Sequence, residues 1–195
     1  MRITGGIFGG LPLAAPRDER VRPTSDKVRQ AIFNILDHND FGSAPAGARV
    51  ADLFAGTGAL GLEALSRGAA FCLFVEDAAE SRGLIRDNVE ALKLTGATKI
   101  WRRDATRLGP MAPGAGGPFD LVFLDPPYRK GLIAPALASL ARGGWMAPGA
   151  VIVAETAADD DIPSTDGFAA IDTRVWGDTR VSFLRPQESG NPAPI

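Results

Sequence analysis

The sequence predicts an α/β fold built on a doubly wound, mostly parallel sheet, and three observations support this prediction. From residue 49 onward, short apolar segments that suit strands alternate with longer segments of helical spacing. Most of the strand segments are apolar at successive positions, as strands covered on both faces are. The 195 residues, 45% hydrophobic and 23% charged, suffice for one globular domain with a small appendage. Alternating strands and helices imply helices on both faces of the sheet.

The first part of the chain is expected to precede the sheet. Residues 1–16 are predicted to form an extended, hairpin-like arm, because Gly5-Gly6 and Gly9-Gly10 separate short apolar stretches. A helix follows, with Thr24 or Ser25 as its N-cap and an apolar face over residues 28–36. We place an N-terminal arm at 1–24, the main domain at 25–185 and a disordered tail at 186–195.

Five strands and three helices account for residues 49–154. The strands are expected at 49–54, 71–75, 100–103, 119–124 and 151–154, and the helices at 60–67, 78–94 and 132–141. Weaker strands near 169–175 and 180–184, joined by a turn at Gly177-Asp178, provide an antiparallel C-terminal strand. The Gly- and Pro-rich residues 109–118 predict a flexible loop.

Composition excludes several classes of protein. The single cysteine, Cys72, and the single histidine, His38, argue against a disulfide, a zinc site and a Ser–His–Asp triad, so no metal is expected. No apolar run reaches about 18 residues and the first residues lack the apolar stretch of a signal peptide, which predicts a cytoplasmic protein with no membrane partner. The net charge of −2 argues weakly against nucleic acid. However, residues 1–30 carry six basic side chains against three acidic ones, and could meet phosphates.

One candidate site follows the first strand. Gly56 to Gly61 fits the pattern G-x-G-x-x-G between a strand and a helix, and Glu76 ends the next strand. Glycines there let an adenosine cofactor approach the backbone, and the carboxylate accepts hydrogen bonds from its ribose. Asp52 lies four residues before the first glycine, where it would repel a pyrophosphate and attract an ammonium or sulfonium group. This arrangement favours S-adenosylmethionine over a nicotinamide dinucleotide.

The third strand provides a further contact. Asp104-Ala105 ends it and is placed to meet the adenine edge, although a helix or turn cap explains Asp104 equally well. The predicted cofactor-binding residues are Asp52, Phe54, Ala55, Gly56, Thr57, Gly58, Glu76, Asp77, Asp104 and Ala105.

A second candidate site, Asp125-Pro126-Pro127-Tyr128, ends the fourth strand. The prolines fix φ near −65° and supply no N–H, so their carbonyls and the Asp125 carboxylate form a rigid group of acceptors. A planar exocyclic amine with two N–H donors matches this group, and Tyr128 can stack on the base that carries the amine. Asp125 needs only to accept a hydrogen bond, which its ordinary pKa allows. These four residues are the predicted catalytic set.

Together these motifs resemble the class I S-adenosylmethionine-dependent methyltransferases that act on amino nitrogens, a superfamily with a Rossmann-like fold. Further segments resemble the RsmD family, and the resemblance covers about residues 1–185. Those segments are Arg2-Ile3-Thr4-Gly5-Gly6, Arg22-Pro23-Thr24, residues 28–34, residues 60–69 and Trp176-Gly177-Asp178-Thr179. The resemblance implies methylation of N2 of one guanine in bacterial 16S ribosomal RNA, within a preformed small-subunit particle.

Such a substrate would require contacts to RNA phosphates, and we expect the protein to act as a monomer. The candidates for phosphate contacts are Arg2, Arg17, Arg22, Arg129 and Lys130.

Three other functions remain open from the sequence. An adenine-N6 or other amino-nitrogen methyltransferase of RNA or DNA uses the same acceptor geometry, commonly with Asn in place of Asp. A nicotinamide-dependent dehydrogenase shares the glycine pattern and Glu76 but has no use for Asp52 or for the residues from Asp125 to Tyr128. A non-enzymatic RNA-binding assembly factor would keep the basic arm without needing the cofactor acids.

Overall fold

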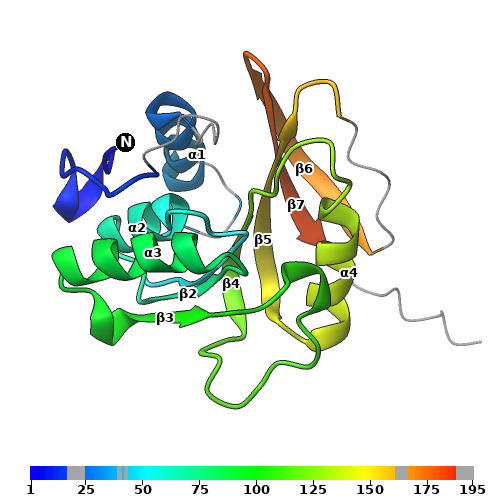
Figure 1. The fold of residues 1–195 in the computed structure, drawn as a ribbon. Coiled ribbons are helices and arrows are strands. Elements are labelled where there is room, and N and C mark those ends of the chain that lie inside the picture. Colours follow the sequence, from blue (N-terminus) through cyan, green and yellow to red (C-terminus); the bar gives the residue numbers. More distant parts are fainter. Residues whose placement is uncertain (17–24, 39–40, 42–43, 161–166, 188–195) are drawn as a thin grey trace, which may run out of the picture.

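The computed structural model describes residues 1–16, 25–38, 41, 44–160 and 167–187. A seven-stranded sheet organises this part of the chain (Figure 1), in the order β3-β2-β1-β4-β5-β7-β6. The first five strands run parallel, and β7 is antiparallel to both of its neighbours. This confirms the predicted fold class. The strands are β1 (Arg49–Leu53), β2 (Phe71–Val75), β3 (Thr98–Trp101), β4 (Phe119–Leu124), β5 (Met146–Ala157), β6 (Phe168–Trp176) and β7 (Thr179–Pro186).

Helices cover both faces of the sheet. One face packs against α1 (Asp26–His38), α2 (Ala59–Ser66) and α3 (Ala79–Ala91), and the other against α4 (Ile133–Gly143) and the short 3-10 turn η3 (Ala105–Arg107). Successive strand residues point to opposite faces, so Val50 joins the first cluster of buried side chains and Ala51 the second. Among the described residues, no helix is long and apolar enough to cross a membrane.

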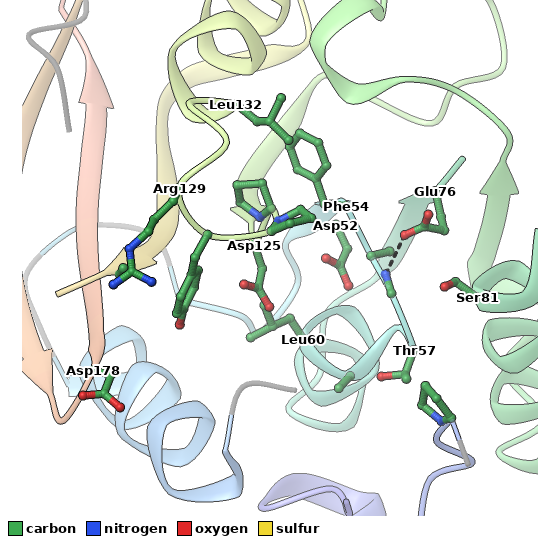
Figure 2. A pocket seen from close by; sticks show the side chains of 18 of the residues that line it. Asp52, Phe54, Thr57, Leu60, Glu76, Ser81, Asp125, Arg129, Leu132 and Asp178 are labelled. Atoms are coloured by element: carbon green, nitrogen blue, oxygen red, sulfur yellow. Dashed lines mark hydrogen bonds between the residues drawn. The ribbon is translucent and has the colours of Figure 1, made fainter. Parts of the chain in front are cut away.

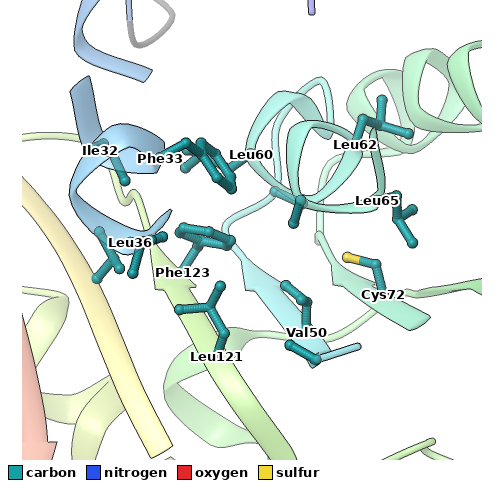
Figure 3. Packing of buried hydrophobic residues seen from close by; sticks show 14 of the residues in the cluster. Ile32, Phe33, Leu36, Val50, Leu60, Leu62, Leu65, Cys72, Leu121 and Phe123 are labelled. Carbon is teal, nitrogen blue, oxygen red and sulfur yellow. The ribbon is translucent and has the colours of Figure 1, made fainter. Parts of the chain in front are cut away.

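The core on the α1–α2 face is closely packed (Figure 3). The Phe33 ring of α1 lies 5.5 Å, centroid to centroid, from the Phe123 ring of β4. Cys72 is fully buried beneath α2 and packs as a small apolar side chain. The amphipathic face of α1, which the spacing of its apolar residues predicts, is therefore buried against the sheet.

The start of α1 and the end of the chain match the sequence in part. Ser25 Oγ accepts a hydrogen bond from the Val28 N–H at 3.2 Å, which makes Ser25 the N-cap. Pro186 ends β7 and the Gln187 N–H donates to the Gly167 carbonyl at 2.7 Å, so ordered chain extends past the boundary expected at 185. Residues 188–195 of the expected tail lie outside the described part.

The Gly- and Pro-rich residues 109–118 form neither helix nor strand, as predicted, and hydrogen bonds attach this loop to the domain. The Trp145 indole N–H donates to the Gly109 carbonyl at 2.8 Å, and the Met111 N–H donates to the Gly143 carbonyl at 2.9 Å. Arg49 and Lys99 donate to carbonyls of Gly116 and Gly114. Composition alone does not reveal these partners, because they come from residues distant in sequence.

Residues 1–16 form a hairpin that is docked on the domain. An antiparallel bridge joins Arg2 and Pro12, and the 3-10 turn η1 (Gly6–Phe8) lies between them. Ile3 and Leu13 are buried in the main core cluster. The hairpin is therefore packed against the domain through apolar side chains.

A buried carboxylate, Glu63 of α2, fixes this hairpin in place. Its two oxygens accept from the Thr4 N–H at 2.7 Å and from the Thr4 hydroxyl at 2.8 Å. Arg29 Nε lies 3.4 Å from Glu63 Oε2, with both side chains fully buried, and Arg67 Nε donates to Oε1 at 2.9 Å. Arg67 also pairs with Asp37 at the end of α1. One carboxylate thus joins the hairpin, α1 and α2.

Replacing Glu63 with Ala is expected to lower the free energy of unfolding by about 3 kcal/mol, because the buried Arg29 guanidinium would lose one of its carboxylate partners while keeping Asp26. Urea unfolding monitored by circular dichroism measures the change. Glu90→Ala, on the exposed side of α3, is the matched control and should change stability by less than about 0.5 kcal/mol. Equal effects of the two substitutions would contradict the role given to Glu63.

Candidate active site

A cavity of about 960 Å³ opens at the carboxyl ends of the central strands (Figure 2). In Figure 2, the side chains of Asp52, Asp125 and Leu60 lie around its middle, and Glu76 and Arg129 lie on opposite sides. Both candidate sites from the sequence therefore contribute to one cavity. Its lining consists of Pro16, Asp52, Phe54, Ala55, Gly56, Thr57, Ala59, Leu60, Glu76, Ser81, Asp125, Pro126, Pro127, Tyr128, Arg129, Leu132, Ala157, Ala158, Asp159 and Asp178.

Pairing of β1 with β4 brings the two sites together. Leu53 and Leu124, the last residues of these strands, are partners in the parallel register. The Asp125 N–H lies 3.5 Å from the Leu53 carbonyl, so the strands separate only beyond this point. The glycine loop then continues to α2 on one face, whereas residues after Asp125 continue to α4 on the other. The cavity lies where these two connections diverge.

Asp52 is buried at the base of the cavity. Its carboxylate accepts the Gly61 N–H at 2.9 Å, which also links the end of β1 to the first turn of α2. Burial raises the pKa of Asp52 from 3.8 to about 8, and the nearby Glu76 charge adds to the rise, whereas the Gly61 hydrogen bond opposes it. A cation bound in the cavity would favour the ionised form.

The Glu76 carboxylate holds the glycine loop by accepting hydrogen bonds from backbone N–H groups. One oxygen accepts the Gly56 N–H at 2.9 Å and the other accepts the Ala78 N–H at 2.8 Å. Gly56 and Gly58 have φ of 55° and 79°, values that favour glycine, and a Cβ at Gly56 would meet nothing closer than 3.9 Å. The loop backbone is therefore open toward the cavity, and the Glu76 oxygens keep lone pairs for a further donor.

The third glycine of the pattern has a different role. A Cβ at Gly61 would lie 2.4 Å from Phe74 Cε1 and 2.5 Å from Cys72 Sγ. Gly61 is therefore required for close packing of α2 on β2, and it is not among the cavity-lining residues of the described chain.

The N-terminal hairpin also supports the cavity, which the sequence motifs did not indicate. The buried Asn88 of α3 accepts from the Ala14 N–H at 2.7 Å and donates to the Ala14 and Thr57 carbonyls at 3.2 and 3.1 Å. Pro16, two residues further, lines the cavity. The Asn88 side chain thus joins the end of the hairpin to the glycine loop. The sequence does not reveal this role, because it depends on where α3 packs in the fold.

The residues from Asp125 to Tyr128 form the opposite wall. Pro126 is buried and Pro127 exposed, while the Tyr128 hydroxyl lies 2.6 Å from Glu155 Oε1 and 2.9 Å from Thr179 Oγ1. Burial and the Glu155 hydrogen bond raise the pKa of Tyr128 well above its ordinary value, so the phenol stays protonated.

Four of the predicted cofactor-binding residues lie outside the cavity lining described here. Asp77 is exposed and its carboxylate lies 3.7 Å from Arg102. Asp104 caps η3 by accepting from the Thr106 N–H at 2.8 Å and from its hydroxyl at 2.6 Å, which lowers the Asp104 pKa. The cap is therefore the arrangement that the structure shows. Ala105 is buried in the core on the α4 face, and Gly58 is buried beneath the loop.

The predicted phosphate contacts differ in their surroundings. Arg129 pairs with Asp159 at 3.0 Å at the cavity rim, so its charge is already partly neutralised. Arg2 is exposed and lies 3.7 Å from Asp26, and Lys130 is exposed. Arg17 and Arg22 lie outside the described residues.

The chemistry of the cavity suits S-adenosylmethionine. The carboxyl groups of Asp52 and Glu76 beside an open glycine backbone fit a ligand with cationic groups and hydroxyls, since a bound cation favours the ionised form of Asp52. The cavity is large enough for an adenosine cofactor and one planar base together.

The fold recurs in solved structures of other proteins. The yhhF protein of Escherichia coli superposes with a TM-score of 0.80 at 30% identity, covering 96% of this chain and 98% of that one. The Pyrococcus abyssi tRNA (uracil-54, C5)-methyltransferase, in complex with S-adenosyl-L-homocysteine, shares the fold at a TM-score of 0.61 and 18% identity, covering 82% and 38%. Fold and cavity define a class I methyltransferase, the class that uses S-adenosylmethionine as methyl donor.

Sequence relatives identify the family. The family described as Conserved hypothetical protein 95 matches residues 1–185. Ribosomal RNA small subunit methyltransferase D of Escherichia coli (strain K12) is 38% identical over 167 residues, covering 84% of this chain and 78% of that protein. The protein of the same name from Haemophilus influenzae is 30% identical over 177 residues, covering 91% and 89%. The chain belongs to the RsmD family, which confirms the resemblance seen in its motifs.

Gly61→Ala is expected to destabilise the fold by about 1–3 kcal/mol, since its methyl group would collide with Phe74 and Cys72. Thermal unfolding measures the change. Gly83→Ala in α3 is the matched control: nothing lies within 4 Å of its Cβ position, so it should stabilise by about 0.5–1 kcal/mol. Destabilisation by both substitutions would contradict the packing role of Gly61.

The raised pKa of Asp52 predicts a pH-dependent stability. Between about pH 4 and pH 8 the folded protein keeps a proton that the unfolded chain has released, so this carboxyl makes stability fall as pH rises through that range. Asp52→Asn, which keeps the shape and an acceptor for Gly61, should remove this part of the decline. Calorimetric melting of both proteins at pH 5, 6.5 and 8 measures it, and parallel curves would contradict the assignment.

Proposed function

We propose that the protein methylates the exocyclic N2 amine of a guanine in small-subunit ribosomal RNA. The observation that carries this proposal is the position of Asp125, at the end of β4 and in the same cavity as Asp52 and the glycine loop. A carboxylate there can accept a hydrogen bond from an amino group while that group faces the methyl donor. The relatives named as small-subunit ribosomal RNA methyltransferases support the choice of substrate.

The protein's part in the reaction is to position and orient the amine. Asp52, Glu76 and the backbone of residues 55–57 would hold S-adenosylmethionine, which supplies an electrophilic methyl group. Asp125 and the Pro126 carbonyl accept the two N–H bonds of the amine, so the nitrogen lone pair is directed away from the base plane. Tyr128 offers its ring to the base. Positioning of this kind lowers a barrier by about 7–11 kcal/mol in well-oriented systems.

No strong base is needed at Asp125. The methylated nitrogen is strongly acidic while it still carries its extra proton, so that proton passes to water or to the carboxylate without assistance. Asp125 lies on the cavity surface and is only partly buried, so its carboxyl oxygens can be reached by an amine in the cavity.

The target base must leave its RNA helix to reach this cavity, since the acceptors lie at its inner wall. We propose a preformed small-subunit particle as the substrate and a monomeric protein as the enzyme. Arg2 and Lys130 are exposed and remain predicted phosphate contacts, together with Arg17 and Arg22. The hairpin of residues 1–16 places Arg2 on the α1–α2 side of the molecule.

Asp125→Ala is expected to lower the rate of methylation of small subunits that lack the mark by about 10²–10³-fold, because one oriented acceptor is lost. Tritium transfer from labelled S-adenosylmethionine measures the rate, and calorimetry should show cofactor binding within about threefold of normal. Asp87→Ala, exposed on α3, is the control with normal activity. Near-normal methylation by Asp125→Ala would refute the assigned role.

The product distinguishes guanine from adenine. Digestion of the methylated RNA to nucleosides and mass spectrometry against standards should give N2-methylguanosine. N6-methyladenosine would overturn the base assignment while leaving the amino-nitrogen chemistry in place.

A further inference from the structure

Tyr128 is held by two buried side chains that lie outside the cavity. Its hydroxyl is 2.6 Å from Glu155 Oε1 and 2.9 Å from Thr179 Oγ1. Glu155 is 4% exposed and Thr179 is 9% exposed, and neither belongs to the described cavity lining, whereas Tyr128 does. Neither side chain is therefore placed to touch a bound base directly, whereas both contact the tyrosine that can.

The direction of the hydrogen bonds follows from the proton count. A phenol has one O–H to donate. A carboxylate can only accept, so the Tyr128 hydroxyl donates to Glu155 and the Thr179 hydroxyl donates to the phenol oxygen. A donor–acceptor distance of 2.6 Å is typical of a charge-assisted O–H···O⁻ bond, which is stronger than a neutral one. The Tyr128 hydroxyl is thus fixed by two hydrogen bonds, one that it donates and one that it accepts.

The two anchors belong to different strands of the rigid sheet. Glu155 lies in β5 and Thr179 starts β7, and the register pairs Glu155 with Val181 and Ala157 with Thr179. Tyr128, in contrast, lies in the connection between β4 and α4, where Arg129 has φ of 59° and no regular element fixes the chain. Without these anchors the ring orientation would depend on a loop alone. With them, it is set by the antiparallel end of the sheet.

We propose that Glu155 and Thr179 are positioning residues that fix the plane of the Tyr128 ring, so that the target base stacks with its amine at Asp125. This inference rests on the proposed function, because it assigns Tyr128 as the stacking surface. It also assigns a function to the antiparallel pair β5 and β7, which lies beyond the part of the sheet that carries the cofactor loop.

A nuclear magnetic resonance experiment tests the anchoring without any substrate. Tyr128 is the only tyrosine of the chain, so protein grown with ring-labelled ¹³C tyrosine gives its signals without assignment. In the wild-type protein the ring should be rigid, and the phenol should not titrate near pH 10, where a free tyrosine does. Glu155→Ala should loosen the ring and lower its titration pH. A mobile wild-type ring, or one unchanged by Glu155→Ala, would overturn the proposal.

A double-mutant cycle tests the effect on methylation. Tyr128→Phe and Glu155→Ala should each lower kcat/KM for small subunits about tenfold, the effect of one charge-assisted hydrogen bond, with cofactor affinity unchanged. The double variant should be no worse than either single one, because both remove the same bond. Glu155→Gln, which keeps an acceptor oxygen, should recover most of the activity. Additive losses would show that Glu155 acts elsewhere and would overturn the proposal.

Thr179→Val provides a second test that does not depend on correct folding of the Glu155 variants. Valine keeps the shape of threonine and removes only its hydroxyl. This substitution should lower kcat/KM about threefold in the wild type and have no effect in Tyr128→Phe. An equal loss in both backgrounds would overturn its positioning role. If the methylated nucleoside were not a guanosine, the proposed function would fail. The double-mutant cycle would still test the positioning role, with the rate of formation of the observed product as its measurement.

Discussion

The parallel pairing of β1 with β4 is the constraint on which the site depends. The chain builds β1, β2 and β3 outward in one direction, then returns to place β4 on the other side of β1. Connections that leave these two neighbours go to opposite faces, so a cavity opens between them at the strand ends. Two chain segments about 70 residues apart thereby form one cavity, just beyond the paired residues Leu53 and Leu124.

The charged side chains that line the cavity are mainly acidic. Among the described residues, five carboxylates line it, and the lining cation Arg129 is paired with one of them. An RNA backbone would be repelled from this interior, while a base or a cationic cofactor would not. The overall acidity of the chain is thus compatible with a nucleic-acid substrate, provided that phosphates stay outside and only a base enters.

Sequence reasoning was sufficient where the chemistry is local. The glycine pattern, Asp52, Glu76 and the residues from Asp125 to Tyr128 could be placed at strand ends because strand ends are visible in a single sequence. Reasoning failed where a residue's partner is distant. The partners of residues 109–118 are an example, because Trp145 and Arg49 are distant in the sequence and composition does not reveal their contacts. Glu63, Asn88 and Glu155 carried no pattern, since each gains its role only from the tertiary contacts it makes.

The attachment of the hairpin to Glu63 has a consequence for synthesis of the chain. Thr4 and Glu63 are separated by 59 residues. At about 5–20 residues per second, a ribosome needs about 3–12 seconds to synthesise the stretch between these two residues. Until α2 has been made, Ile3 and Leu13 lack the part of their core that this helix supplies.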